Sequence, residues 1–236
     1  MTSRREEKDR RRAERLAAEQ SASEQAKRRR TYSIVVGAVL GIAALAAIVA
    51  VAATGGGGNG HDVRASEITG DGTYRDAAPA PSQTETDLFA AARAAGCVLR
   101  NPVIEGRQHV EPGTKVEYKT TPPTSGNHDP SPAGDGVYSD APTTSTTKNF
   151  VHTLEHGRII IQYDPGLQKR RIDQLGGLFN EDPYHMVLMP NRRMDYAVAV
   201  TAWGHLLGCE KVTDATFDAV RGFRDRYRDQ GPEQAA

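Results

Sequence analysis

The residues best suited to chemistry stand in the segment Val151–Gly157, which reads VHTLEHG. Its two histidines, His152 and His156, are four positions apart, and on a helix this spacing places two imidazoles on one face, where both can bind one metal ion. As H-x-x-E-H the segment also matches the inverted zinc-peptidase pattern, in which Glu155 would be the general base. An extended chain would instead point Glu155 away from both histidines. Metal binding, structural histidines and catalysis all stay open.

Two further histidines precede this segment. His128 ends the stretch 121–128, TPPTSGNH, whose adjacent prolines predict a rigid loop, and His109 stands on a preceding predicted hairpin. The metal hypothesis predicts that four side chains converge on one divalent ion, zinc or copper: His109, His128, His152 and His156. The alternative is that the 121–128 loop recognises a protein partner while the histidines are structural.

A third pattern bears on copper. The segment Tyr184–Pro190, YHMVLMP, combines an imidazole with two thioethers, and these ligands together suit Cu(I). On a strand, however, His185 and Met189 face one way and Met186 the other. At least one of the two methionines is therefore expected to fill the core.

The elements that must position these residues are short. Apolar periodicity with capping residues predicts helices over 85–95, 168–179 and 213–228, the first begun by Ser82 or Thr84 and ended by Gly96. Runs of β-branched and apolar residues predict strands over 158–163, 184–189 and 196–202. A hairpin of 107–110 with 115–119 is expected around the turn 111–113, followed by a long loop over 120–147. This pattern indicates a single α+β domain with a small mixed or antiparallel sheet and two to three helices.

The chain contains two cysteines, Cys97 and Cys209. An even count in an oxidising compartment favours a disulfide, which would tie the first predicted helix to the last third of the domain. Free thiols acting as metal ligands are the alternative. Neither cysteine has the paired spacing of a zinc knuckle.

Residues 31–53 contain no charged residue. As a helix they would measure roughly 34 Å, enough to cross a hydrocarbon core of about 30 Å, so we expect a transmembrane signal anchor. The preceding residues 1–30 hold eleven Lys or Arg and six Asp or Glu, which predicts a cytoplasmic tail. Residues 54–81 are expected to be a flexible linker and 82–230 an extracytoplasmic domain. A cleaved signal peptide is the rival interpretation of the apolar segment.

Charge and motifs exclude other function classes. Residues 31–236 carry 19 basic and 24 acidic residues, a net charge of −5 that argues against nucleic acid as a partner. The basic tail is expected to contact anionic lipid. The chain has no P-loop or nucleophile elbow, and its glycine-rich run 55–60 lies in the predicted linker rather than between a strand and a helix, so no nucleotide cofactor is expected.

Several of these segments together resemble a known family. The block PPTSGNH ending at His128, RQHV around His109, GVY at 136–138, and VHTLEHG before an apolar strand resemble the largely actinobacterial family described as domain of unknown function 3105. The resemblance covers about residues 82–210, and it implies a single-pass or secreted protein with the four histidines as motif positions. Many relatives have Pro after the Ser-Gly pair, where this chain has Asn127. The resemblance implies no particular activity.

The sequence therefore predicts a membrane-anchored extracytoplasmic domain that binds zinc or copper in a binding, delivery or sensing role. A cell-envelope interaction module is the first alternative. A metal-dependent hydrolase with Glu155 as general base is the second, and we expect a binding role rather than catalysis.

Overall fold

The computed structural model describes residues 70–233. The predicted cytoplasmic tail 1–30, the predicted anchor 31–53 and most of the predicted linker lie outside this range. Among the described helices, none combines the length and the apolar character that crossing a membrane requires.

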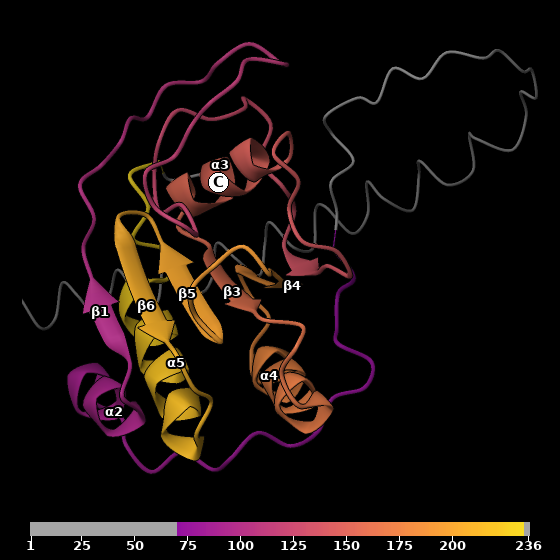
Figure 1. Cartoon of the computed structure of the whole chain (residues 1–236), viewed down its shortest axis with the longest axis vertical. Coiled ribbons are helices and arrows are strands. Elements are labelled where there is room, and N and C mark those ends of the chain that lie inside the picture. Colours follow the sequence, from indigo (N-terminus) through magenta and orange to yellow (C-terminus); the bar gives the residue numbers. More distant parts are fainter. Residues whose placement is uncertain (1–69, 234–236) are drawn as a thin grey trace, which may run out of the picture. The chain divides into compact units, whose positions relative to one another are not determined.

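The centre of the domain is a six-stranded mixed sheet with the order β1-β6-β5-β3-β4-β2 (Figure 1). Strands β3, β4 and β2 are parallel to one another, and the other neighbours are antiparallel. This arrangement confirms the α+β class and decides for a mixed sheet. The strands are β1 (Val98–Arg100), β2 (Gly136–Val137), β3 (Ile159–Tyr163), β4 (Met186–Pro190), β5 (Val198–Ala202) and β6 (His205–Cys209).

Three helices cover one face of the sheet, namely α2 (Leu88–Ala95), α4 (Lys169–Glu181) and α5 (Asp214–Tyr227). Successive side chains of a strand point to opposite faces, so Ile159 and Ile161 of β3 pack against these helices. Large side chains fill this core from the helical side, including Phe179 of α4 and Phe217 of α5, both fully buried. This core is the largest of the three hydrophobic clusters among the described residues.

The opposite face is covered by a fourth helix, α3 (Thr147–Glu155), and by the loops around it (Figure 1). Ile160 of β3 points to this side and packs with Phe150, Val151 and Leu154 of α3. The sheet thus lies between a layer of three helices and a layer formed by α3 with irregular chain. The latter layer carries the histidines.

The predicted long helices and central strands are confirmed to within a few residues, although α2 is capped by Asp87 rather than by Ser82 or Thr84. Four further expectations were incomplete or wrong. The described residues contain four helices rather than two to three, because α3 is only nine residues long and directly follows a long stretch of loop-forming residues. The hairpin around 111–113 is absent from the described chain: its turn forms, while His109 pairs with His128 instead. Strand β6 was not predicted. Residues 70–81, expected to be linker, lie against α4.

That contact is made by Tyr74. Its backbone N–H donates to Oδ1 of Asn180 (2.9 Å), and its hydroxyl donates to Oδ1 of Asp173 (3.2 Å). The ring lies so close to Gly176 of α4 that a Cβ there would meet it at 2.1 Å. Isolated contacts such as this one and the hydrogen bond from the N–H of Ala78 to the carbonyl of Asp173 (2.9 Å) leave no periodic pattern, which explains why the sequence indicated only a spacer.

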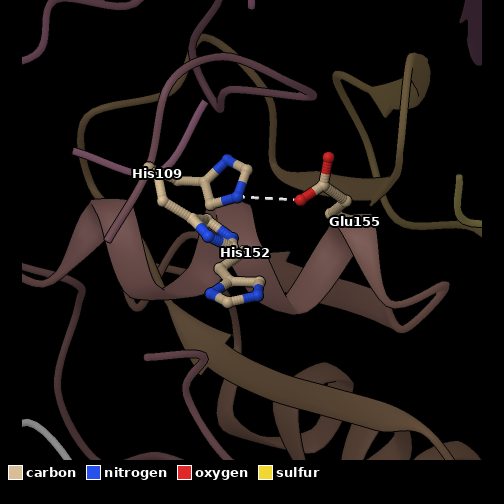
Figure 2. Close-up of side chains that lie close together, drawn as sticks. His109, His152 and Glu155 are labelled. Atoms are coloured by element: carbon tan, nitrogen blue, oxygen red, sulfur yellow. Dashed lines mark ion pairs between the residues drawn. The ribbon is translucent and has the colours of Figure 1, made fainter. Parts of the chain in front are cut away.

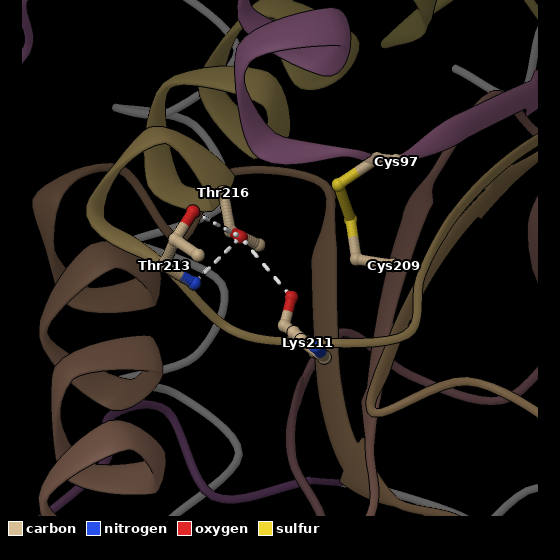
Figure 3. Close-up of a disulfide and its surroundings, with 5 residues drawn as sticks. All are labelled: Cys97, Cys209, Lys211, Thr213 and Thr216. Atoms are coloured by element: carbon tan, nitrogen blue, oxygen red, sulfur yellow. Dashed lines mark hydrogen bonds between the residues drawn. A yellow bond between two sulfur atoms is a disulfide. The ribbon is translucent and has the colours of Figure 1, made fainter.

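The predicted disulfide between Cys97 and Cys209 is confirmed (Figure 3). Strand β1 pairs with β6 through Val98 and Gly208, so the two cysteines occupy the next opposed positions, with Cα atoms 4.3 Å apart. Nearby, the backbone N–H of Thr213 donates to Oγ1 of Thr216 (3.0 Å) and begins α5. With both cysteines in the disulfide, neither offers a thiolate to a metal.

Candidate metal centre

Helix α3 carries three of the polar side chains at the centre of the candidate site. It ends in a Schellman motif: the N–H of Gly157 donates to the carbonyl of Leu154 (2.9 Å) and that of Arg158 to the carbonyl of Thr153 (3.3 Å). Gly157 adopts φ 79°, which a residue without Cβ accepts readily. The helix therefore persists through His152 and Glu155 and ends at His156, so that all three side chains leave from its last turns.

The polar side of α3 is buried under the irregular chain between β1 and β2. The Asn149 amide donates to the carbonyl of Ser131 (2.7 Å), and the hydroxyl of Thr153 donates to that of Ala133 (2.7 Å). Irregular chain has carbonyls that no sheet or helix satisfies, and burial makes such groups costly when unpaired. The helix supplies the missing donors and thereby fixes the loop that carries His128.

His109 and His128 come together through a short parallel bridge. The N–H of His128 donates to the carbonyl of Gln108 (3.0 Å), and the N–H of Val110 donates to the carbonyl of His128 (2.8 Å). Trp203 packs edge-on against the His128 ring, with centroids 5.9 Å apart. His128 is thus completely buried, while His109 lies exposed at the rim.

Three imidazoles and one carboxylate gather above α3 (Figure 2). The ring centroids of His109, His128 and His152 are 4.7–4.9 Å apart in every pair. One ligand atom from each residue lies within 4.8 Å of the others, which is the spacing of donors around one metal ion. We call this group the three-histidine set; its members are His109, His128, His152 and Glu155.

Backbone carbonyls fix the orientation of the two buried rings. Nδ1 of His128 lies 2.8 Å from the carbonyl oxygen of Gly126, and Nδ1 of His152 lies 2.7 Å from that of Asp129. A carbonyl only accepts, so each Nδ1 carries the proton and, in the neutral ring, each Nε2 presents a lone pair. This is the arrangement in which protein histidines bind metals, with the second nitrogen held by a backbone carbonyl.

The Nε2 atom of His128 has an unusual environment. It lies 2.8 Å from Oε2 of Glu155, the pair marked by the dashed line in Figure 2. The contact lacks the angles of a hydrogen bond, so this fully buried nitrogen has no hydrogen-bonding partner among the described residues. Two acceptors facing each other at this distance require a proton or a cation between or beside them, because their lone pairs repel.

A second group overlaps the first. Nε2 of His152 lies 2.9 Å from Nε2 of His156, and Oε2 of Glu233 lies 3.5 Å from the same His156 atom. One ligand atom from each of these three residues again lies within 4.8 Å of the others. We call His152, His156 and Glu233 the C-terminal set. Glu233 was not predicted, because it stands far along the chain from the histidines in a segment without a motif.

Burial keeps His152, the histidine that belongs to both sets, neutral. It lowers the pKa of His152 from 6.5 to about 4, against the opposing effect of the Asp129 carbonyl, and neighbouring imidazoles lower it further. Burial and the positive charge of Arg158 also lower the pKa of His156, although Glu233 acts in the opposite direction. Neutral imidazole is the form that binds metals, so little proton competition is expected at neutral pH.

The thioethers of Met186 and Met189 lie outside both ligand sets. Met186 packs in the core under α2, α4 and α5, whereas Met189 packs in the core under α3. They face opposite sides of the sheet, and His185 is paired with Asp229, with Nδ1 2.6 Å from Oδ1. The His185–Met186–Met189 pattern therefore makes no common Cu(I) site.

A cavity of about 250 Å³ lies beside α3, on the side away from the histidines. Its lining includes Phe150 and Leu154 of α3, with the amides of Gln162 and Asn191 and the guanidinium of Arg193. None of the four predicted histidines lines it. The hollow and the histidine cluster are therefore separate features.

Comparison with known proteins agrees with the motifs described above. The family model described as "Protein of unknown function (DUF3105)" matches residues 109–236, beginning at His109 and including all four histidines and Glu233. This span starts later and ends later than the 82–210 expected from the motifs, so α2 and β1 precede it. No curated protein and no solved structure matches the chain. With more than half of its length matched, the chain belongs to the DUF3105 family of proteins of unknown function.

Proposed function

We propose that this protein is a membrane-anchored extracytoplasmic domain whose three-histidine set binds one divalent transition-metal ion, with zinc as the preferred ion. Its role would be metal binding, delivery or sensing. The observation that carries the proposal is the convergence of His109, His128 and His152, whose two buried members each have Nδ1 fixed by a backbone carbonyl.

The unpartnered Nε2 of His128 supports the same proposal. A buried polar atom without a partner is costly, on the order of 1–3 kcal/mol, and a cation between His128 and Glu155 would remove this cost. Glu155 then serves as an oxygen ligand. The four side chains together satisfy the number of ligands that zinc normally takes from a protein.

The donor atoms favour zinc over Cu(I). The three-histidine set offers three imidazole nitrogens and one carboxylate, and both sulfur types are engaged elsewhere, in the disulfide and in the cores. Cu(I) prefers soft sulfur ligands, whereas Zn²⁺ and Cu(II) bind nitrogen and oxygen. Cu(II) is therefore the competing ion to include in a test.

Burial of the 121–128 loop speaks for metal binding over a recognition loop. Thr124, Ser125 and His128 of this loop are all 0 % exposed. A segment packed this deeply offers a partner little surface. The interaction module therefore becomes the result to consider only if metal binding fails.

Two features support the proposed location. The apolar segment 31–53 with its basic flank predicts an anchor with the domain outside, and the Cys97–Cys209 disulfide suits an oxidising compartment. Anionic lipid beside the basic tail and a cell-envelope protein remain the proposed partners.

The test is to purify the protein without a His-tag and measure bound metal by elemental analysis, then titrate metal-free protein with Zn²⁺ and Cu²⁺. We expect about one ion per chain for a filled site. The double variant His128→Gln/His152→Gln should lose it. His185→Gln is the matched control, since this imidazole is hydrogen-bonded to Asp229 outside both sets and its loss should leave metal content unchanged. Folded protein that takes up neither ion would refute the proposal.

A hydrolase is the second candidate, favoured by one specific observation. The C-terminal set consists of two histidines and one glutamate, a ligand combination typical of catalytic zinc, and Glu155 stands within the same H-x-x-E-H motif. Glu155→Gln separates the two functions. Under the main proposal it weakens metal binding, because Glu155 is a ligand. In a hydrolase it would retain the metal and abolish turnover of a peptide and ester panel.

A further inference from the structure

The three-histidine set and the C-terminal set share one atom. Nδ1 of His152 donates to the Asp129 carbonyl, so Nε2 is the only nitrogen of this ring that can bind a metal. Both sets need that nitrogen. A lone pair binds one ion at a time, so the two sets cannot both use His152 at once.

The C-terminal set is held in place by backbone contacts rather than by chance. The N–H of Asp229 donates to the carbonyl of Gly157 (2.8 Å), and the N–H of Glu233 donates to the carbonyl of Glu155 (3.2 Å). Between them, Gly231 lies so close to α3 that a Cβ would meet the Glu155 carbonyl oxygen at 2.1 Å. The segment 229–233 thus crosses the end of α3 and presents Glu233 to the histidines.

The two sets differ in access to solvent. The Glu233 side chain is 51 % exposed and that of His156 14 %, whereas the side chains of His128 and Glu155 are 0 % and 7 % exposed. An ion arriving along segment 229–233 therefore meets Glu233 and His156 before it meets the buried ligands, whereas exposed His109 marks the other approach to the three-histidine set. The carboxylate adds negative charge where a cation would first lose water.

We propose that the C-terminal set is the loading and release station for the metal of the three-histidine set, and that one ion passes between the two sets while it stays bound to Nε2 of His152. The inference rests on the proposed function. The step is a ligand exchange: His156 and Glu233 leave the ion as His109, His128 and Glu155 replace them. It involves no change of oxidation state.

The test measures Zn²⁺ uptake and its transfer to a chelating indicator by stopped flow, with the full chain. Glu233→Gln removes the solvent-side charge and His156→Gln its partner. Each should slow uptake and release by about tenfold or more, the order by which a charged entry changes association rates, with the equilibrium affinity little changed. Glu210→Gln is the matched control, because this exposed glutamate belongs to neither set, and it should exchange zinc at the wild-type rate.

A second measurement tests zinc binding by the C-terminal set alone. His128→Gln removes a ligand of the buried set only, so this variant should keep a weak zinc site that disappears when Glu233→Gln is added. Persistence of that weak site in the double variant would overturn the inference. So would binding of two ions per wild-type chain, or wild-type exchange rates in Glu233→Gln, which would indicate entry past exposed His109. Failure of the wild type to bind zinc refutes the proposed function instead.

Discussion

His152 is the residue on which both candidate ligand sets depend. Its ring is 3 % exposed and its pKa is lowered from 6.5 to about 4, chiefly by burial. In the unfolded chain the same imidazole takes up a proton near pH 6.5. The folded protein therefore binds fewer protons than the unfolded chain between these two values.

This difference predicts the pH dependence of stability for the metal-free protein. Above about pH 6.5 this imidazole is neutral in both states and its lowered pKa does not affect stability. As the pH falls from about 6.5 to about 4 the unfolded chain takes up the proton first, so stability is lost by up to about 1.4 kcal/mol per pH unit for this group. Urea unfolding of chelator-treated protein between pH 7.5 and pH 4.5 measures it. His152→Asn, which keeps a donor for the Asp129 carbonyl, should show a shallower pH dependence. If the free energy of unfolding changed equally with pH in the wild type and in His152→Asn, the pH dependence could not be assigned to His152.

At the level of single residues, the sequence identified most of the candidate site. Residue type and spacing were enough to single out His152 and His156, because the i, i+4 relation is local. The placement of His109 beside His128 was expected only as convergence, and the actual bridge replaced a predicted hairpin. Glu233 was not identifiable: its position depends on backbone contacts of segment 229–233 with the end of α3, which no local pattern encodes.

Helix α3 is the element that the sequence obscured. It is buried on both sides, by the sheet through Phe150 and Leu154 and by the loop through Asn149 and Thr153. A helix of this kind shows polar residues where burial would predict apolar ones. By contrast, α5 and β3 were predicted well, since α5 has one apolar stripe and β3 is a run of buried β-branched residues. Strands as short as β1 and β2 depend on their partners and give no signal of their own.

The end of α3 allows a matched test of this packing. Gly157 has φ 79°, and an added Cβ would lie 2.8 Å from Cα of Asp229. Gly113 has a similar φ of 86°, with nothing within 4 Å of the added atom. Gly113→Ala should therefore cost only the left-handed strain, about 1–2 kcal/mol. Gly157→Ala should cost clearly more and should also displace segment 229–233.

Urea unfolding curves of the two variants give the comparison, and zinc exchange rates report the displaced segment. Equal losses of stability would show that segment 229–233 does not press on Gly157 in solution.

For the whole molecule, the disulfide joins the two ends of the described fold. It connects the end of α2 to β6 across a sequence separation of 112 residues. Removing a native disulfide from a small extracytoplasmic domain typically costs 2–5 kcal/mol. Cys97→Ser/Cys209→Ser should lose stability in this range, measured by urea unfolding. Reducing agent should lower the stability of the wild type to that of the variant, whose own stability should not respond.

The region matched by the family model contains only one of the two cysteines. It begins at His109, so Cys97, α2 and β1 lie before the matched region and Cys209 lies within it. The sequence predicted the pairing from an even cysteine count alone. The register that brings the cysteines together, through Val98 and Gly208, depends on β6, which was not predicted.

The position of the disulfide also determines what proteolysis can release. The long irregular chain between β1 and β2 lies wholly between the two cysteines. A protease that cuts there severs the backbone, yet the two fragments remain covalently joined through sulfur. Nicked protein would migrate as one species without reductant and as two with it. A cut before His109 would leave all members of the three-histidine set on the C-terminal fragment. That fragment would be shed from the N-terminal one only where the cut is followed by reduction, which makes its release dependent on the redox state of its surroundings.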